Sequence, residues 1–332
     1  MSRSHAAARA MELGLDLTTD ARGRAIESDA IRRDVEREFR VKLSRGVYAT
    51  TEIWQSKSPD ERFEAFVIGI AASLADDVVF SHNAAAVLTG LPRLGPWPHQ
   101  VEVTIPPASG GRSTGNVRRY GAALRDDEVV EMSGFLITSV PRTIVDLART
   151  SSFAQGVAVA DAALHRKRRP TPLMSVDELA AELEYQRGRS RFVKMRRVAE
   201  FASPLSDSVR ESHSRVLIHE LGFPPPVLQQ PWFDAEGHIG DTDFWWPEHD
   251  LVGEFDGYVK FIKAEFTRGR SVDQVVLAEK TREDRIRARG PRFARWDTPY
   301  LRAPRRLARL LVDAGLPARP RSRYSYGMPP QV

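Results

Sequence analysis

Apolar positions recur with a helical period between residues 58 and 91. On one face of residues 58–74 the pattern places Phe63, Phe66, Val67 and Ile70. We expect further helices near residues 153–164, 175–186 and 191–201, and strands at 101–105, 117–120 and 135–138. This part of the chain therefore predicts helices mixed with strands.

A short helix followed by a tight hairpin is predicted between residues 28 and 48. Ser28 is a suitable N-cap for a helix over 29–37. Two extended runs, 41–43 and 46–48, flank Ser44 and Arg45. This order is typical of a winged helix-turn-helix, although any small helix joined to a hairpin produces it as well. The candidate DNA-binding side chains are Arg32, Arg33, Arg37, Lys42 and Arg45.

A join near Ala202 and Pro204 precedes a region with a different order of elements. We expect a helix over 206–221, strands over 241–246 and 251–255, a helix over 272–288, a strand over 292–296 and a helix over 302–314. The predicted fold class is mixed α/β (α+β), with this α-β-β-α-β-α unit after a winged helix-turn-helix and a mixed α/β region. The expected domains are residues 1–55, 56–202 and 203–318, followed by a basic tail at 319–332.

The composition excludes several kinds of chemistry. The 332 residues include no cysteine, which excludes a disulfide scaffold, a cysteine nucleophile, thiolate-bound zinc and an iron–sulfur cluster. Lys and Arg outnumber Asp and Glu by 49 to 44, and their clustering favours nucleic acid as a partner. No apolar run approaches the roughly 20 residues of a membrane span, and the first residues carry no signal-peptide pattern. We therefore expect a cytoplasmic protein with no membrane partner.

Three carboxylates are predicted to lie together in the second region. Asp243 falls in one predicted strand, and Glu254 and Asp256 fall two positions apart in the next, so both project from the same face. Such a group is electrostatically costly. Mg²⁺ or Mn²⁺ would relieve the repulsion and could activate water for phosphodiester cleavage. Lys260 lies within reach of this catalytic group, and Glu211 in the preceding helix could complete the metal ligands.

Other interpretations of this segment stay open. A solvent-exposed hairpin with scattered acidic residues produces the same spacing, and Asp241 could replace Asp243 as a ligand. A hydrolase that acts on something other than nucleic acid has little support, because the chain has no Gly-x-Ser-x-Gly elbow, no phosphate-binding glycine loop and no His-Glu-x-x-His.

Several motifs of the second region are typical of one family. They are Ser208-x-x-Glu-Ser-x-x-Arg, Gly222-Phe-Pro, Asp243-Phe-x-Trp-Pro, Glu254-Phe-Asp-Gly-x-x-Lys and Glu279-Lys-x-Arg-Glu-Asp, with Gln229 or Gln230, Gly290 and Arg295-Trp also matching. Residues 205–300 resemble the restriction-endonuclease-like, Vsr-like domains of unknown function common in actinobacteria. The broader PD-(D/E)XK pattern implies Asp243 and Glu254 as metal ligands. It places a lysine where this chain has Asp256, so Lys260 or Lys280 would have to substitute.

The first region resembles another family more loosely. The matching motifs are Leu43-Ser-Arg-Gly-Val-Tyr, Ser81-His-x-x-Ala-Ala, Gly90-Leu-Pro, Thr138-Ser-Val-Pro-Arg-Thr and Asp161-Ala-Ala-Leu. Residues 1–200 resemble AbiEi-type antitoxins of type IV toxin–antitoxin systems. The resemblance implies an N-terminal winged helix that binds promoter DNA, and a toxin protein as a possible partner.

Two functional hypotheses follow. The first is a DNA-binding protein with a metal-dependent nuclease-like domain, an Mg²⁺- or Mn²⁺-dependent endonuclease of genome defence or repair. The second is a transcriptional regulator or antitoxin that binds DNA and a toxin, with a catalytically inactive nuclease fold. The displaced lysine and the antitoxin-like first region favour the second hypothesis, and the grouped carboxylates favour the first.

Overall fold

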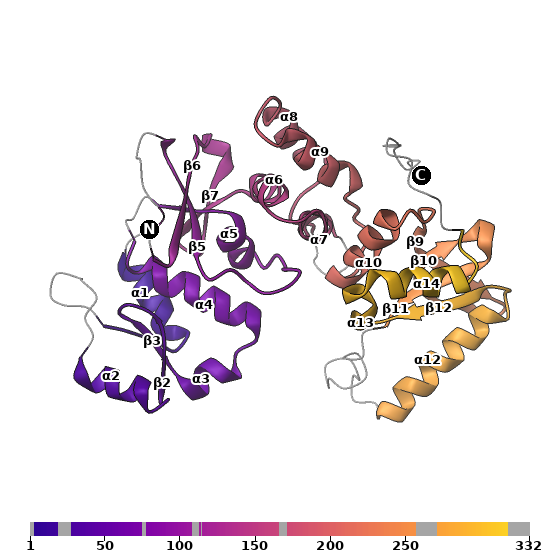
Figure 1. Cartoon of the computed structure of the whole chain (residues 1–332), viewed down its shortest axis with the longest axis horizontal. Helices are drawn as coiled ribbons and strands as arrows, with labels where there is room; N and C mark the ends of the chain where they lie inside the picture. Colours follow the sequence, from indigo (N-terminus) through magenta and orange to yellow (C-terminus); the bar gives the residue numbers. More distant parts are fainter. Residues whose placement is uncertain are drawn as a thin grey trace. The chain divides into compact units, whose positions relative to one another are not determined.

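The computed structural model describes residues 3–18, 28–74, 78–107, 113, 115–165, 171–256 and 271–317. These residues form helices together with three sheets, so the predicted mixed α/β class is confirmed. The chain divides into two compact units (Figure 1). Unit 1 comprises Met1–Val159 and Leu173–Ala199, and unit 2 comprises Ala160–Pro172 and Glu200–Val332. Unit 2 therefore resumes beside the join that the sequence places near Ala202.

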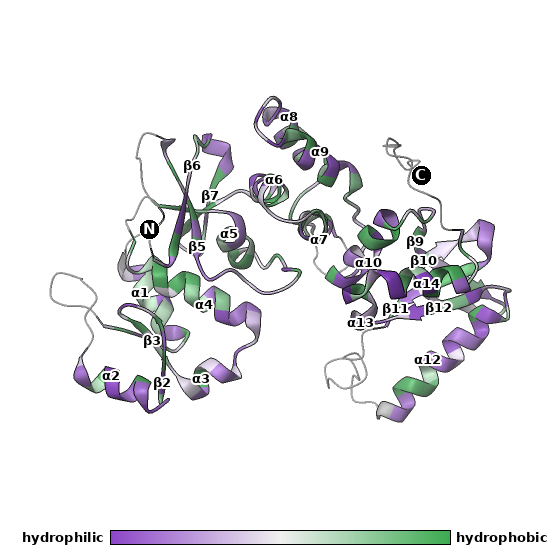
Figure 2. Ribbon diagram, viewed as in Figure 1, coloured by the Kyte–Doolittle hydropathy of each residue, from purple (hydrophilic) through white to green (hydrophobic). Residues whose placement is uncertain are grey.

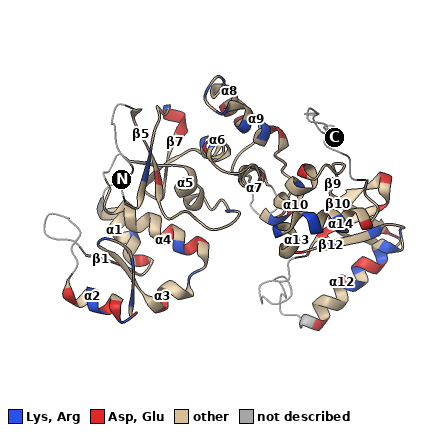
Figure 3. Cartoon of the chain, in the orientation of Figure 1, with Lys and Arg blue, Asp and Glu red and all other residues tan. Residues whose placement is uncertain are grey.

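Unit 1 begins with helices around a small antiparallel sheet. Its first elements are α1 (Arg3–Glu12), β1 (Leu15–Leu17), α2 (Asp29–Glu36), β2 (Arg40–Ser44), β3 (Val47–Thr50), α3 (Thr51–Ser56) and α4 (Pro59–Ala71). The strand order is β1-β3-β2. Ser28 accepts a hydrogen bond from the backbone N–H of Ile31, which confirms the predicted N-cap of α2. Figure 2 shows that α2 is largely hydrophilic, and Figure 3 shows charges of both signs along it.

A five-stranded sheet completes unit 1. The remaining elements up to residue 201 are β4 (Val79–Phe80), α5 (His82–Leu88), β5 (Val101–Ile105), β6 (Val117–Gly121), the 3₁₀ turn η2 (Asp126–Glu128), β7 (Val129–Met132), β8 (Phe135–Thr138), α6 (Val140–Thr150), α7 (Phe153–Leu164), α8 (Val176–Tyr185) and α9 (Phe192–Phe201). The strand order is β6-β5-β4-β8-β7, with β5–β6 and β4–β8 parallel.

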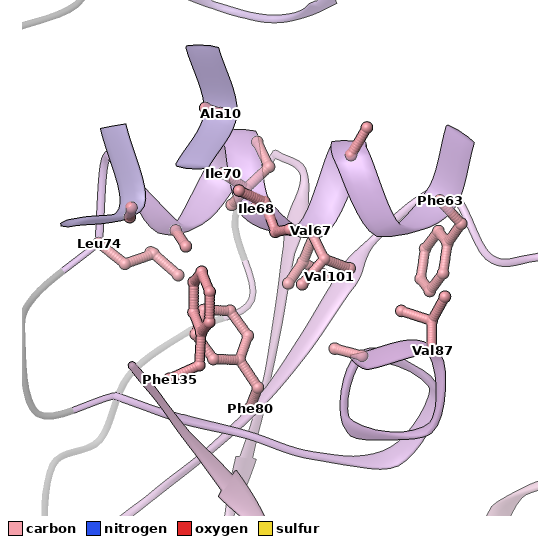
Figure 4. Packing of buried hydrophobic residues seen from close by; sticks show 14 of the residues in the cluster. Ala10, Phe63, Val67, Ile68, Ile70, Leu74, Phe80, Val87, Val101 and Phe135 are labelled. Atoms are coloured by element: carbon pink, nitrogen blue, oxygen red, sulfur yellow. The ribbon is translucent and has the colours of Figure 1, made fainter. Parts of the chain in front are cut away.

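The two sheets of unit 1 share one hydrophobic core. Phe80 and Phe135 meet edge to face, with ring centroids 5.8 Å apart, and belong to the same buried cluster as Val67 of α4 (Figure 4). The same buried cluster contains Ala10 of α1 and Val47 of β3. The boundary that we expected at residue 55 therefore does not divide the hydrophobic core.

Unit 2 is built on a four-stranded sheet with the order β12-β11-β10-β9. Its elements are α10 (Val209–Glu220), β9 (Val227–Asp234), β10 (Gly237–Trp246), the 3₁₀ turn η3 (Pro247–His249), β11 (Leu251–Phe255), α12 (Val272–Arg287), β12 (Arg292–Trp296), α13 (Thr298–Arg302) and α14 (Pro304–Asp313). β9, β10 and β11 pair antiparallel, and β11 pairs parallel with β12.

The predicted order of elements in unit 2 needs two corrections. Strand β9 is absent from the α-β-β-α-β-α prediction, because it contains Pro231 and two glutamines rather than alternating apolar residues. An edge strand tolerates proline, since one row of its N–H groups needs no partner. The helix expected over 302–314 is present as α14, but a further short helix, α13, precedes it. The two are separated at Ala303, which has φ −127° and precedes Pro304.

Candidate acidic and arginine site

The basic side chains predicted to contact DNA lie on one helix and one hairpin of unit 1. All are exposed: Arg32, Arg33, Arg37, Lys42 and Arg45. α2 has no fully buried residue, and Gly46 takes a φ of 79° at the turn between β2 and β3, a conformation that glycine adopts without strain. Arg32 is paired with Asp29 at 2.8 Å, and both side chains are exposed. The segment therefore presents basic groups to solvent, with some acidic groups between them.

In unit 2, Glu254 is buried on the face of the sheet that points away from the hydrophobic core. Phe255 belongs to the core, which also contains Trp246 and Trp296. Because side chains alternate along a strand, Glu254 projects to the opposite face, where it is only 6% exposed. Phe244 of β10 pairs with Gly253 of β11, so Asp243 lies beside Glu254 on the neighbouring strand. The predicted proximity of these two carboxylates is present in the fold.

Glu211 and Gln229 extend this acidic group. Ser208 caps α10, and Glu211 in the first turn accepts hydrogen bonds from the Ser208 hydroxyl at 2.7 Å and from the backbone N–H of Asp207 at 2.8 Å. The Gln229 amide donates to Glu211 at 3.3 Å and to Asp243 at 3.5 Å. The structure therefore brings Glu211, Asp243 and Glu254, the three candidate metal ligands, into one neighbourhood.

Two arginines lie at the centre of the site, and the sequence analysis assigned no role to either. Arg282 of α12 donates from Nη2 to one Glu254 oxygen at 2.6 Å, and Arg295 of β12 lies 2.7 Å from the other oxygen through its own Nη2. Both guanidinium groups also contact Glu279, at 2.7 and 2.9 Å. Figure 3 shows the alternating charges of α12 that supply part of this network. The signal that could have found Arg295 is its register, since it pairs with Glu254 across the parallel strands β11 and β12.

Burial and ion pairing move the acidic pKa values in opposite directions. Burial is the largest influence on Glu254, and with the nearby Asp243 charge it raises the pKa of Glu254 in spite of the two arginines. Burial alone would also raise the pKa of Glu279, but hydrogen bonds and charge attraction from Arg282 and Arg295 lower it to about 2. Glu279 is therefore an anion at neutral pH, whereas burial disfavours the charged form of Glu254.

Only one of the remaining predicted catalytic residues lies in this ion network within the described part of the chain. Asp256 pairs with Arg295 at 3.1 Å, so the residue in the position of the expected lysine belongs to the same ion network. Lys280 is an exposed side chain of α12, and within the described ranges no carboxylate pairs with it. Lys260 lies outside the described residues. Asp241, the alternative ligand, contacts the exposed His238 at 3.0 Å, which leaves Asp243 as the carboxylate beside Glu254.

The candidate ligands of this site are carboxylates, so the ion to consider is Mg²⁺ or Mn²⁺. Carboxylate oxygens suit these ions in kind. However, among the residues that the structure describes, no group of three or more Asp, Glu, His or Cys side chains is placed to hold a metal ion. Both Glu254 oxygens contact arginines, and one Asp243 oxygen accepts the Phe255 backbone N–H at 2.9 Å. As arranged, these residues do not fit a divalent cation.

Comparison with known proteins gives a partial match. No protein-family profile matches the chain. The chain is similar to two uncharacterized proteins of Mycobacterium tuberculosis, one from strain CDC 1551 / Oshkosh and one from strain H37Rv, each 32% identical over 139 residues. The match covers 42% of this chain and 48% of each relative, so the chain spans about half the length of the curated relatives it matches.

The helices were also compared with the length and hydropathy that a bilayer requires. Within the described part of the chain, none is both long enough and apolar enough to span a membrane.

Proposed function

We propose that the protein binds DNA through α2 and the β2–β3 hairpin of unit 1. The observation that carries the proposal is the exposure of five basic side chains on this one helix and hairpin: Arg32, Arg33, Arg37, Lys42 and Arg45. The order of elements supports it, because α2 directly precedes the hairpin and β3 pairs with β1, as expected of a winged helix-turn-helix. Half-buried Ile31 and Val35 anchor α2, and its arginines stay on the solvent side.

Binding of this kind is governed by phosphate contacts. Each phosphate neutralised by Lys or Arg releases counterions, so the logarithm of the binding constant falls with the logarithm of salt concentration by roughly 0.9 per contact. The acidic residues of α2 reduce the net attraction, and Arg32 must share its guanidinium with Asp29. We therefore expect Arg33 and the hairpin residues Lys42 and Arg45 to contribute more than Arg32.

The test is fluorescence anisotropy with a labelled DNA duplex at several salt concentrations. Replacing the five side chains with alanine is expected to weaken binding and flatten the salt dependence. Arg33→Ala and Arg187→Ala form a matched pair, because both arginines are exposed, one at α2 and one after α8, where Arg187 pairs with Glu184. Equal effects of these two substitutions, or unchanged binding by the five-site variant, would show that α2 and the hairpin are not the DNA-binding surface.

A second candidate function is divalent-metal-dependent DNA cleavage by unit 2. One observation favours it, which is the convergence of Glu211, Asp243 and Glu254 from α10, β10 and β11. For this activity Glu254 would have to exchange its arginine partners. The test is nicking of a supercoiled plasmid with Mg²⁺ or Mn²⁺ by the wild type and by Asp243→Asn. Cleavage that Asp243→Asn abolishes would establish the activity, and equal cleavage by both proteins would assign it to another site or a contaminant.

A further inference from the structure

The buried carboxylate of Glu254 has a separate guanidinium group at each of its two oxygens. Oε1 accepts from Arg282 at 2.6 Å and Oε2 lies 2.7 Å from Arg295. The arginines come from α12 and β12, so the packing of two elements against β11 creates the arrangement. A carboxylate so far removed from water needs compensating positive charge. Here the compensation comes from the protein itself.

The two arginines are themselves surrounded by acidic groups. Arg282 donates from Nε and Nη2 to Glu279, at 2.9 and 2.7 Å. Arg295 contacts Glu279 at 2.9 Å, Glu283 at 2.9 Å and Asp256 at 3.1 Å. Carboxylates therefore engage these guanidinium groups on several sides, which makes the pair unsuitable for gripping a phosphate. The two arginines instead neutralise the acidic residues around them in unit 2.

We infer that Arg282 and Arg295 take the place of a divalent cation at the acidic centre of unit 2. A metal ion beside Glu254 and Asp243 would need the Glu254 oxygens that the guanidinium groups occupy, so arginine and metal compete for the same acceptors. The repulsion between two neighbouring carboxylates is relieved by fixed protein cations. This inference does not depend on DNA binding by α2 and the hairpin, which lie in unit 1.

The inference predicts a latent metal site. Removing one arginine frees a Glu254 oxygen beside Asp243 and deletes a positive charge that repels an incoming cation. Arg282→Ala is the direct substitution, because Arg282 comes from a helix that contacts the sheet and not from the sheet itself. Lys280→Ala is the matched control, because it removes an equal charge from the same helix at an exposed position.

The experiment is Mn²⁺ binding to the full-length protein, followed by the electron paramagnetic resonance signal of free Mn²⁺. We expect weak binding by the wild type and by Lys280→Ala. Arg282→Ala should bind Mn²⁺ at least about tenfold more tightly, and adding Asp243→Asn to that variant should remove the gain. Tight binding by the wild type that Asp243→Asn abolishes would overturn the inference. So would a folded Arg282→Ala protein that binds Mn²⁺ no better than the wild type.

Loss of a buried partner can also prevent folding, so a measurement on the wild type accompanies the variants. Thermal unfolding of the wild type and of Asp243→Asn is recorded with and without Mn²⁺. Equal unfolding temperatures in each pair support the inference, because a ligand that does not bind the native state does not stabilise it. An Mn²⁺-induced rise in the wild type that Asp243→Asn loses would refute it. DNA binding, read separately by anisotropy, reports on the proposed function of unit 1.

Discussion

Arg142 holds a buried ion network in unit 1, and its removal should be among the most damaging single changes in the chain. Arg142 and Glu128 are each 1% exposed, and Asp146 is 3% exposed. The guanidinium group donates to Glu128 at 2.8 Å and to Asp146 at 2.9 Å. The network joins the 3₁₀ turn η2 to α6. We consider Arg142→Met, which keeps much of the aliphatic volume and deletes the charge.

The expected loss of stability follows from the buried carboxylates that the substitution leaves without Arg142. Glu128 and Asp146 lose the buried guanidinium group that they share, and they keep the ion pairs of Glu128 with Arg125 at 3.6 Å and of Asp146 with Arg149 at 3.2 Å. Breaking a buried pair by removing one partner costs about 3–5 kcal/mol. The same change at the exposed Arg32–Asp29 pair should cost about 0–1 kcal/mol, because water replaces the lost partner. Against a domain stability of about 5–15 kcal/mol, the loss at Arg142 is a large fraction of the total.

Native-state hydrogen exchange of the amides in α6 measures this loss within unit 1. We expect Arg142→Met to accelerate exchange in α6 strongly and Arg32→Met to leave it nearly unchanged. The double variant Arg142→Met with Glu128→Gln should recover part of the loss, because one uncompensated charge is gone. Equal effects of Arg142→Met and Arg32→Met would refute the reasoning that burial makes the network costly to break.

The pH dependence of the loss gives a second check. Burial opposes ionisation of Glu128, but hydrogen bonds and charge attraction from Arg125 and Arg142 lower the pKa of Glu128 below its usual value. In the wild type, its stabilising contribution is therefore present above the unfolded pKa of about 4.3 and is lost as pH falls through the lower folded pKa. In Arg142→Met the buried Glu128 should instead resist ionisation. The difference in the free energy of unfolding between the wild type and Arg142→Met should therefore shrink below about pH 4.

Three further changes test other parts of the fold. Gly253→Ala should destabilise unit 2 by about 1–3 kcal/mol, because the added Cβ would lie 2.7 Å from the buried Trp296 ring. Unfolding in urea, followed by tryptophan fluorescence, measures this loss. Gly121→Ala is the control, because its added Cβ meets no atom closer than 3.7 Å. Glu279→Gln should reduce the loss of unit 2 stability that occurs as pH falls from about 4.3 toward 2, since the pKa of Glu279 is about 2 in the folded protein. Urea unfolding at several pH values measures this reduction. Replacing the exposed arginines of α13 and α14 with alanine should leave the salt dependence of DNA binding unchanged, because the proposed contacts lie on α2 and the hairpin of unit 1. A slope lowered by about 0.9 per replaced residue would make this face a contact surface as well. The residues replaced are Arg302, Arg305, Arg306 and Arg309.

The elements that the sequence predicts well are those with a long, uninterrupted pattern. The helix over 153–164 and the strands over 251–255 and 292–296 have their predicted bounds. Strands β1, β4 and β7 were not expected; β1 and β4 span three and two residues, too few to show an alternation. β7 and β8 each span four residues, but only β8 has the buried apolar positions that make a strand recognisable from the sequence. β9 is longer, but its proline and glutamines are typical of a loop, so the sequence alone does not predict a strand there. Its hydrogen bonding to β10 makes it one.

The candidate site likewise combines residues whose proximity follows from neighbouring segments of the chain with residues from distant segments. Asp243 and Glu254 could be placed together because a hairpin joins their strands. Glu211 could be named only as a candidate from the preceding helix, since nothing local brings it to the sheet. Arg282 and Arg295 lie far along the chain, and although both belong to motifs that match the family, nothing local assigns them as partners of Glu254. Their role depends on how α12 and β12 pack against β11.

Acidic spacing therefore predicts a requirement for positive charge and leaves the nature of that charge undetermined. A metal ion and a guanidinium group satisfy the same carboxylate oxygens, and both reduce the same repulsion. The sequence shows that Glu254 and Asp243 need a cation, since both carboxylates project from one face of neighbouring strands. Only the tertiary structure shows that arginine side chains from two other elements reach Glu254 at 2.6 and 2.7 Å. For this acidic centre, the identity of the cation is a property of packing.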